Sequence, residues 1–129
     1  MRYLLIHKLD ESLPEAWNPS QEFIEQMGAF MGEYASSGVL LTAEGVHKSD
    51  EGAIVRKSSN GLSVTDGPFS EAREVIGGFA LVNVASKEDA VEVASRFADL
   101  FGEVSVEVRR VFEEEDLEAY QAEQGATTA

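Results

Sequence analysis

The two histidines of the chain, His7 and His47, are the first residues to consider for chemistry near neutral pH. Histidine changes its charge close to pH 7, so an acid, a base or a metal site built on imidazole must use one or both of them. His7 lies within a predicted strand, where the alternative is a hydrogen-bonded interior or interface histidine. His47 follows a predicted strand in a polar loop, where the alternative is a solvated residue. Both are candidate catalytic residues.

Asp66 is a third candidate, because it is followed directly by Gly67 and Pro68. These residue types form a rigid turn, and a carboxylate on such a turn could act as a general base or anchor a ligand. The alternative is that Asp66 caps its own turn by accepting backbone N–H groups. Nearby, Glu74 and its charged neighbours could bind a polar ligand or form a charged surface, and the sequence does not separate these two roles.

Arg109 and Tyr3 complete the candidate site. A guanidinium in an otherwise acidic protein could hold a carboxylate or phenolate in a fixed orientation, and an aromatic ring would add apolar contact. We therefore predict a cavity lined by His7, Tyr3 and Arg109, with Asp66 and His47 at its rim. The alternative for Arg109 is an ion pair with Glu107 or with a carboxylate of a partner chain.

Several kinds of chemistry are excluded or left without support. The chain contains no cysteine, which removes disulfides, thiolate metal sites and cysteine nucleophiles. It shows no glycine-rich phosphate loop, no His/Asp cluster with metal-ligand spacing and no nucleophile elbow. We therefore predict no metal and no cofactor.

The size and charge of the chain narrow its location and its partners. A chain of 129 residues fits one domain with a substantial core. Its net charge of −14 repels nucleic acid phosphates and anionic lipids, so neither is an expected partner. The apolar stretch at the amino terminus is too short for that of a signal peptide, and no apolar run is long enough to span a bilayer. The expected location is cytoplasmic.

The hydrophobic pattern predicts an alternation of strands and helices. Strands are expected at 2–8, 39–46, 79–84 and 104–108, with a hairpin formed by 53–57 and 62–66 around Asn60-Gly61. Helices are expected at about 20–37, capped by Ser20 and stopped at Gly38, and from Ser86 to Gly102. The second helix is expected to bury one apolar stripe: Ala90, Val91, Ala94, Phe97, Ala98 and Phe101. The stripe of Phe, Met and Tyr on the first helix is interpreted as core.

This order predicts an α+β, ferredoxin-like fold: β-α-β, an inserted β-hairpin, and β-α-β, with two helices on one face of an antiparallel sheet. If the valines of 104–108 face the helices, Glu107 and Arg109 lie on the opposite face. We expect two groups of residues to join them there: Tyr3, Leu5 and His7, and Phe79, Leu81 and Asn83. Beyond residue 112, an acidic extension (113–129) is expected to be helical to Tyr120 and then to fray.

One segment carries a resemblance to a known family. Residues 64–79 read V-T-D-G-P-F-S-E-A-R-E-V-I-G-G-F. This resembles the signature of the DGPF proteins, a branch of the YCII-related family, with Arg73 where lysine is more usual. The flanks agree, with M-R-Y-L-L-I at the start, A-E-G-V at 43–46 and V-E-V-R-R-V at 106–111. The resemblance covers residues 1–112.

The resemblance implies a ferredoxin-like chain that associates through its sheet, as dimeric α/β-barrel proteins do, and whose biochemical role is largely unassigned. We expect a homodimer or an assembly of dimers. Catalytic YCII-like proteins resemble one another in pairing a histidine of the first helix with an aspartate, but residues 20–37 contain no histidine. That pair cannot be transferred to this chain.

Three functions remain open at this point. The first is binding of a small polar or aromatic acid in a cavity between paired sheets. The second is a lyase or isomerase acting through His/Asp acid–base chemistry. The third is an adaptor linked to sigma-factor-type transcription regulation, because DGPF-like proteins resemble partners found beside such factors.

Overall fold

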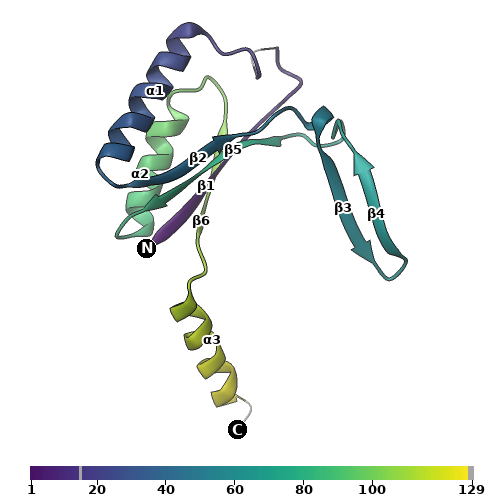
Figure 1. Cartoon of the computed structure of the whole chain (residues 1–129), viewed down its shortest axis with the longest axis vertical. Coiled ribbons are helices and arrows are strands. Elements are labelled where there is room, and N and C mark those ends of the chain that lie inside the picture. The colour runs from purple at the N-terminus through teal and green to yellow at the C-terminus, as the bar shows by residue number, and fades with distance from the viewer. Residues whose placement is uncertain (15, 128–129) are drawn as a thin grey trace.

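The computed structural model describes residues 1–14 and 16–127 of the chain. A four-stranded sheet carries two helices on one side, and a hairpin and a third helix extend away from this body (Figure 1). The elements are β1 (Arg2–Leu9), α1 (Gln21–Ser36), β2 (Leu40–Gly45), a short 3-10 turn (Ser49–Glu51), β3 (Ala53–Ser58), β4 (Gly61–Asp66), β5 (Val75–Asn83), α2 (Lys87–Ala98), β6 (Ser105–Arg110) and α3 (Glu114–Thr127).

The sheet has the strand order β2-β5-β1-β6, and every neighbouring pair is antiparallel. The two crossovers through α1 and α2 give the ferredoxin-like α+β fold, so the predicted fold class is confirmed. The predicted hairpin forms a separate two-stranded sheet, β3–β4. Within one chain the four-stranded sheet is open and does not close into a barrel.

The helix boundaries follow the capping residues that the sequence indicates. The Ser20 side chain accepts a hydrogen bond from the backbone N–H of Phe23, and that of Ser86 accepts one from Asp89. Gly38 has a φ of 82°, the left-handed conformation that ends α1. The stripe predicted for α2 was wrong at one position: Val91 is exposed, and Val93 is buried in its place.

The two faces of β1 are reversed relative to the prediction. Leu5 lies opposite Val108 and His7 opposite Val106, and directly opposed residues of an antiparallel pair share a face. Tyr3, Leu5 and His7 therefore lie on the helix side, and their expected place beside Arg109 was wrong. Phe79, Leu81 and Asn83 do share the open face with Glu107 and Arg109, since β5 pairs them with Ile6, Leu4 and Arg2.

The buried core lies between α2 and the sheet. It consists of Tyr3, Leu5, Val82, Ala90, Val93 and Ala94. In contrast, α1 contains no fully buried residue, although Phe30 and Tyr34 pack against the edge of this core. The first helix therefore lies over the sheet without closing tightly onto it.

A compact corner, Asp66–Phe69, links the hairpin to the main sheet. Its Gly67-Pro68 peptide bond is cis. The backbone N–H of Phe69 donates to Ser49 Oγ over 2.8 Å, and the buried Ser49 hydroxyl donates to the carboxylate of Glu11. The corner is thereby tied to two other loops of the chain.

The acidic extension forms one helix, α3, whose last described residue is Thr127 rather than Tyr120. Arg2 holds its start through two hydrogen bonds from the guanidinium to Glu113, at 2.7 and 2.9 Å. Fraying at the last two residues lies outside the described part of the chain. Across 1–14 and 16–127, no helix has both the length and the apolar character needed to cross a membrane.

Candidate functional site

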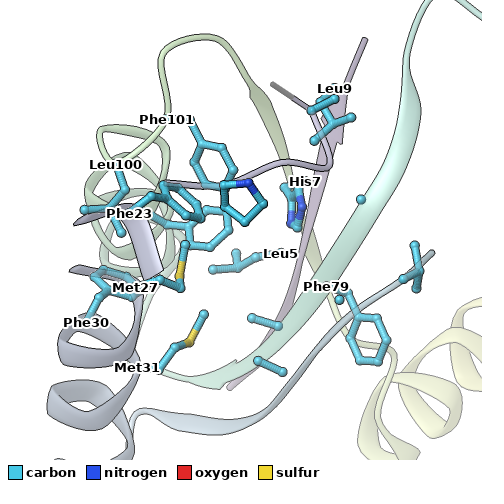
Figure 2. Close-up of a pocket in the computed structure, with 18 of the residues that line it drawn as sticks. Leu5, His7, Leu9, Phe23, Met27, Phe30, Met31, Phe79, Leu100 and Phe101 are labelled. Carbon is cyan, nitrogen blue, oxygen red and sulfur yellow. The ribbon is translucent and has the colours of Figure 1, made fainter. Parts of the chain in front are cut away.

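A cavity of about 900 Å³ lies between α1 and the sheet. Met27 and Met31 of α1 face Leu5 and His7 of β1 across it, and Phe101, beyond the end of α2, lies beside His7 (Figure 2). Ligand cavities in proteins span roughly 300–1,000 Å³ and have mainly apolar walls with few polar groups. In size and lining this cavity is typical of a small-molecule site.

His7 is a polar group among these apolar walls. Its ring packs against Phe97 and Phe101, with centroids 5.3 and 5.5 Å away. Burial lowers the pKa of His7 below its ordinary value of 6.5, because the charged form loses hydration. Neither ring nitrogen has a hydrogen-bond partner among the described residues. At pH 7 the imidazole is neutral, with one nitrogen to donate and one to accept.

Gly77 and Gly78 make room for this histidine. A Cβ on Gly77 would lie 2.5 Å from His7 Nε2, and one on Gly78 would lie 2.7 Å from His7 Cε1. The same atom on Gly78 would lie 2.6 Å from the backbone oxygen of Glu44 in β2. The Gly-Gly pair therefore allows β5 to approach both the imidazole and the neighbouring strand closely.

The rim of the cavity is acidic. Trp17 closes part of it by donating from Nε1 to the backbone oxygen of Val46 over 3.2 Å. Asp10 and Glu103 belong to the lining, as does Glu44, although the pairing of Glu44 with Phe79 places its side chain on the open face. No lysine or arginine is found among the described lining residues. An anionic ligand would therefore find no countercharge here.

The two other candidate catalytic residues lie away from the cavity. The His47 side chain is 86% exposed and its Nδ1 lies 3.0 Å from a carboxylate oxygen of Glu51. Asp66 ends β4, opposite Ala53. Neither lines the cavity between α1 and the sheet. The structure therefore does not bring His7, His47 and Asp66 together.

The three candidate ligand-binding residues are also dispersed. Arg109 is exposed on the open face and pairs with Glu107 at 3.0 Å, which is the alternative that the sequence left open. Glu74 accepts a 2.6 Å hydrogen bond from the Ser105 hydroxyl, which links the start of β5 to β6. Tyr3 is buried in the core. Of the predicted site residues, His7 alone lines the cavity.

Sequence reasoning missed the wall contributed by α1. Phe23, Met27, Phe30 and Met31 were assigned to the core because helical spacing is the usual mark of core packing. In the structure they line the cavity. The available signal was the pair of methionines, because flexible thioether side chains are common on surfaces that adapt to ligands.

No group of three or more His, Asp or Glu side chains in the described part of the chain is arranged to hold a metal. The polar side chains of the cavity lining include the neutral imidazole of His7, the carboxylates of Asp10 and Glu103, and the side chains of Asn18, Ser20 and Tyr34. Such a set can donate and accept hydrogen bonds and can stabilise a cation. These features define a ferredoxin-like α+β protein with a helix–sheet cavity.

The model of the YCII-related domain matches residues 1–115, and the chain belongs to this family. A relative from Rhizobium meliloti (strain 1021) is 29% identical over 96 residues, which cover 73% of this chain and 77% of that protein. That relative is described as an uncharacterized protein. The family assignment therefore supplies the fold and leaves the biochemical role to be argued from the site.

Proposed function

We propose that this YCII-related protein binds a small, mainly apolar molecule that carries a neutral or cationic polar group, in the cavity between α1 and the sheet. The observation that carries the proposal is a neutral, unpartnered His7 facing apolar walls across about 900 Å³. His7 is only partly buried, and a hydrogen bond from a ligand would form there among apolar walls, where it is stronger than in water. His7 would fix the orientation of the ligand, and the walls would supply most of the affinity.

The charge of the lining favours this ligand class over the aromatic acid expected from the sequence. That expectation depended on Arg109, which lies on the other face of the sheet. With carboxylates at the rim and a chain charge of −14, an anion is repelled at both short and long range. A neutral amide or an ammonium group meets no such penalty.

The site supports binding more than catalysis. General acid–base chemistry needs a second group to orient or complement the histidine. No described carboxylate hydrogen-bonds to His7, and His47 and Asp66 do not line the cavity. We therefore do not extend the proposal to the lyase or isomerase alternative.

The test uses three indoles that differ mainly in charge: indole-3-acetamide, tryptamine and indole-3-acetate. Titration calorimetry at pH 7.5 should show binding of the amide and the amine. The acetate should bind roughly tenfold more weakly or not at all, since tenfold corresponds to about 1.4 kcal/mol, the scale of one unfavourable charge contact.

The control compares two tryptophan substitutions on α1, one inside the cavity lining and one outside it. Met27→Trp should narrow the cavity opposite His7 and weaken binding, whereas Ile24→Trp, at an exposed position outside the lining, should bind as wild type does. His7→Phe should keep the apolar walls and weaken binding of the amide most. If none of the three indoles binds, or if Met27→Trp binds them unchanged, the cavity is not their site.

We also propose that the chain forms a homodimer through its open sheet face. Leu4, Ile6, Phe79 and Leu81 place apolar side chains on this face, which α1 and α2 leave uncovered (Figure 1). A one-sided antiparallel sheet normally turns polar residues to water, so the apolar side chains on this mixed face favour packing against a second sheet.

Sedimentation velocity should show a species of twice the 14.0 kDa chain mass at micromolar concentration. Ile6→Glu should shift it to monomer, whereas Val91→Glu, on the exposed side of α2, should leave the dimer intact. A wild-type protein that sediments as a monomer throughout would refute this proposal.

A further inference from the structure

The β3–β4 hairpin has one apolar face that its own chain leaves uncovered. The register pairs Val55 with Val64 and Lys57 with Leu62, so these side chains share a face. Val55, Leu62 and Val64 are 65%, 72% and 65% exposed. An isolated two-stranded hairpin is at best marginally stable in water. Packing of its apolar face against another surface would therefore stabilise the hairpin, and the single chain does not supply that surface.

The helix α3 has the complementary character. Leu117 and Tyr120, one turn apart, form an exposed apolar stripe, and Phe112 precedes it. The flanking residues 113–123 contain six acidic side chains and no basic one. The pairing of Arg2 with Glu113 and of Arg110 with Asp116 holds the start of this helix against the sheet. The helix thus presents an acidic, partly apolar surface in a defined direction.

Charge complements the match of apolar surfaces. Residues 53–66 carry two basic residues, Arg56 and Lys57, against the single acidic Asp66, in a chain whose net charge is −14. The hairpin therefore carries a net positive charge in an acidic chain, and α3 is among the most acidic stretches of that chain. Opposite charges around an apolar contact favour association of these two surfaces.

Within one chain the two elements do not meet. The hairpin and α3 project from separate places on the sheet (Figure 1), and neither packs extensively on another described helix or strand. A hairpin of one copy and an α3 of another satisfy both surfaces at once. In a two-fold dimer the same contact forms twice.

We propose that, in the homodimer, the β3–β4 hairpin of each copy packs against α3 of the other copy. The proposal rests on the homodimer inferred above and adds a reciprocal clasp to it. Val55, Leu62 and Val64 cover Leu117 and Tyr120, while Lys57, on the same face, meets the carboxylates of Glu114 and Glu118. Arg56 lies on the opposite face of the hairpin and adds to its positive charge at longer range. The occupant of each surface is a second copy of this chain.

Charge reversal on the full-length chain tests the clasp. Arg56→Glu with Lys57→Glu should raise the dimer dissociation constant at least tenfold in sedimentation velocity at low salt. Glu114→Lys with Glu118→Lys should do the same. Combining all four changes should return the constant to within about threefold of wild type, because the contact is restored with its charges exchanged.

Two controls separate the clasp from net charge and from helix loss. Lys87→Glu changes an exposed lysine at the start of α2 and should leave the dimer unaffected. Circular dichroism of the α3 variants should show unchanged helix content. If the four-fold variant is no tighter than either pair, or if neither pair weakens a dimer that wild type does form, the clasp is wrong and the sheet contact stands alone. A monomeric wild type would overturn both proposals.

Discussion

At the scale of single residues, Gly67 shows how closely the Asp66–Phe69 corner is packed. A Cβ built on Gly67 would lie 1.6 Å from the backbone oxygen of Ser49, so no side chain fits there. Ser49 in turn is buried, donates to Glu11 and accepts from the Phe69 backbone. Gly67 therefore lets three segments of the chain meet at one point.

We expect Gly67→Ala to lower the free energy of unfolding by about 1–3 kcal/mol, the usual cost of forcing an extra carbon into a packed region. The backbone of Ser49 must move to admit the methyl group, and its hydrogen bonds to Glu11 and Phe69 move with it. Urea unfolding followed by circular dichroism measures the change.

Gly52→Ala is the matched control for this corner. A Cβ at Gly52 would sit in ordinary contact, 3.5 Å from Ser49 O and 3.6 Å from Phe69 Cζ. Its unfolding midpoint should stay near that of wild type. Equal midpoints for the two alanine variants would show that the corner adapts freely and does not depend on Gly67.

His7 marks the limit of residue-by-residue reading of the sequence. Its type made it a candidate, and its strand was correctly placed, because both depend on local pattern. Its surroundings depend on residues that are distant in sequence: Phe97 and Phe101 at the end of α2, and Gly77 and Gly78 in β5. Sequence spacing carries no information about such encounters.

At the scale of elements, the strands and helices were predictable and the faces of β1 were not. Serine caps, the Asn60-Gly61 turn and the helical spacing act within a few residues, so they can be read locally. In β1 both faces carry apolar side chains: Leu4 and Ile6 on one, Leu5 on the other. Alternation then cannot distinguish core from open face, and only the pairing with β6 decides it.

The first helix illustrates a second limit. A stripe of apolar residues at helical spacing predicts that the helix lies on something apolar, and α1 does lie over the sheet. How closely it approaches is set by the loops at its ends and by the side chains below it. The same apolar stripe is therefore expected whether the helix covers a filled core or a cavity of about 900 Å³.

At the scale of the whole molecule, two effects with opposite signs determine how stability changes as the pH falls: protonation of His7 and relief of the negative charge. The pKa of His7 is lowered in the folded chain, so the unfolded chain binds more protons as the pH falls below 6.5. His7 thus contributes stability that is fully present above pH 6.5 and is lost as the pH falls toward its folded pKa. Protonation elsewhere reduces the charge of −14 and relieves repulsion, which acts in the opposite direction.

The carboxylates of the ion pairs act at lower pH. The pKa of Glu113 is lowered chiefly by its hydrogen bond from Arg2, and that of Glu107 chiefly by its hydrogen bond from Lys8. Their ordinary value is 4.5, so their contribution is present above that pH and is lost below it as they protonate. Both carboxylates therefore stay ionised in a comparison between pH 7.5 and pH 5.5.

Between pH 7.5 and pH 5.5, protonation of His7 should lower the free energy of unfolding of wild type relative to that of His7→Gln. The glutamine side chain gains no proton in this range. The difference between the two variants cancels the relief of repulsion, which they share. Urea unfolding at both pH values gives the four free energies. If His7→Gln and wild type respond identically to pH, then burial of His7 does not disfavour its charged form in the folded chain.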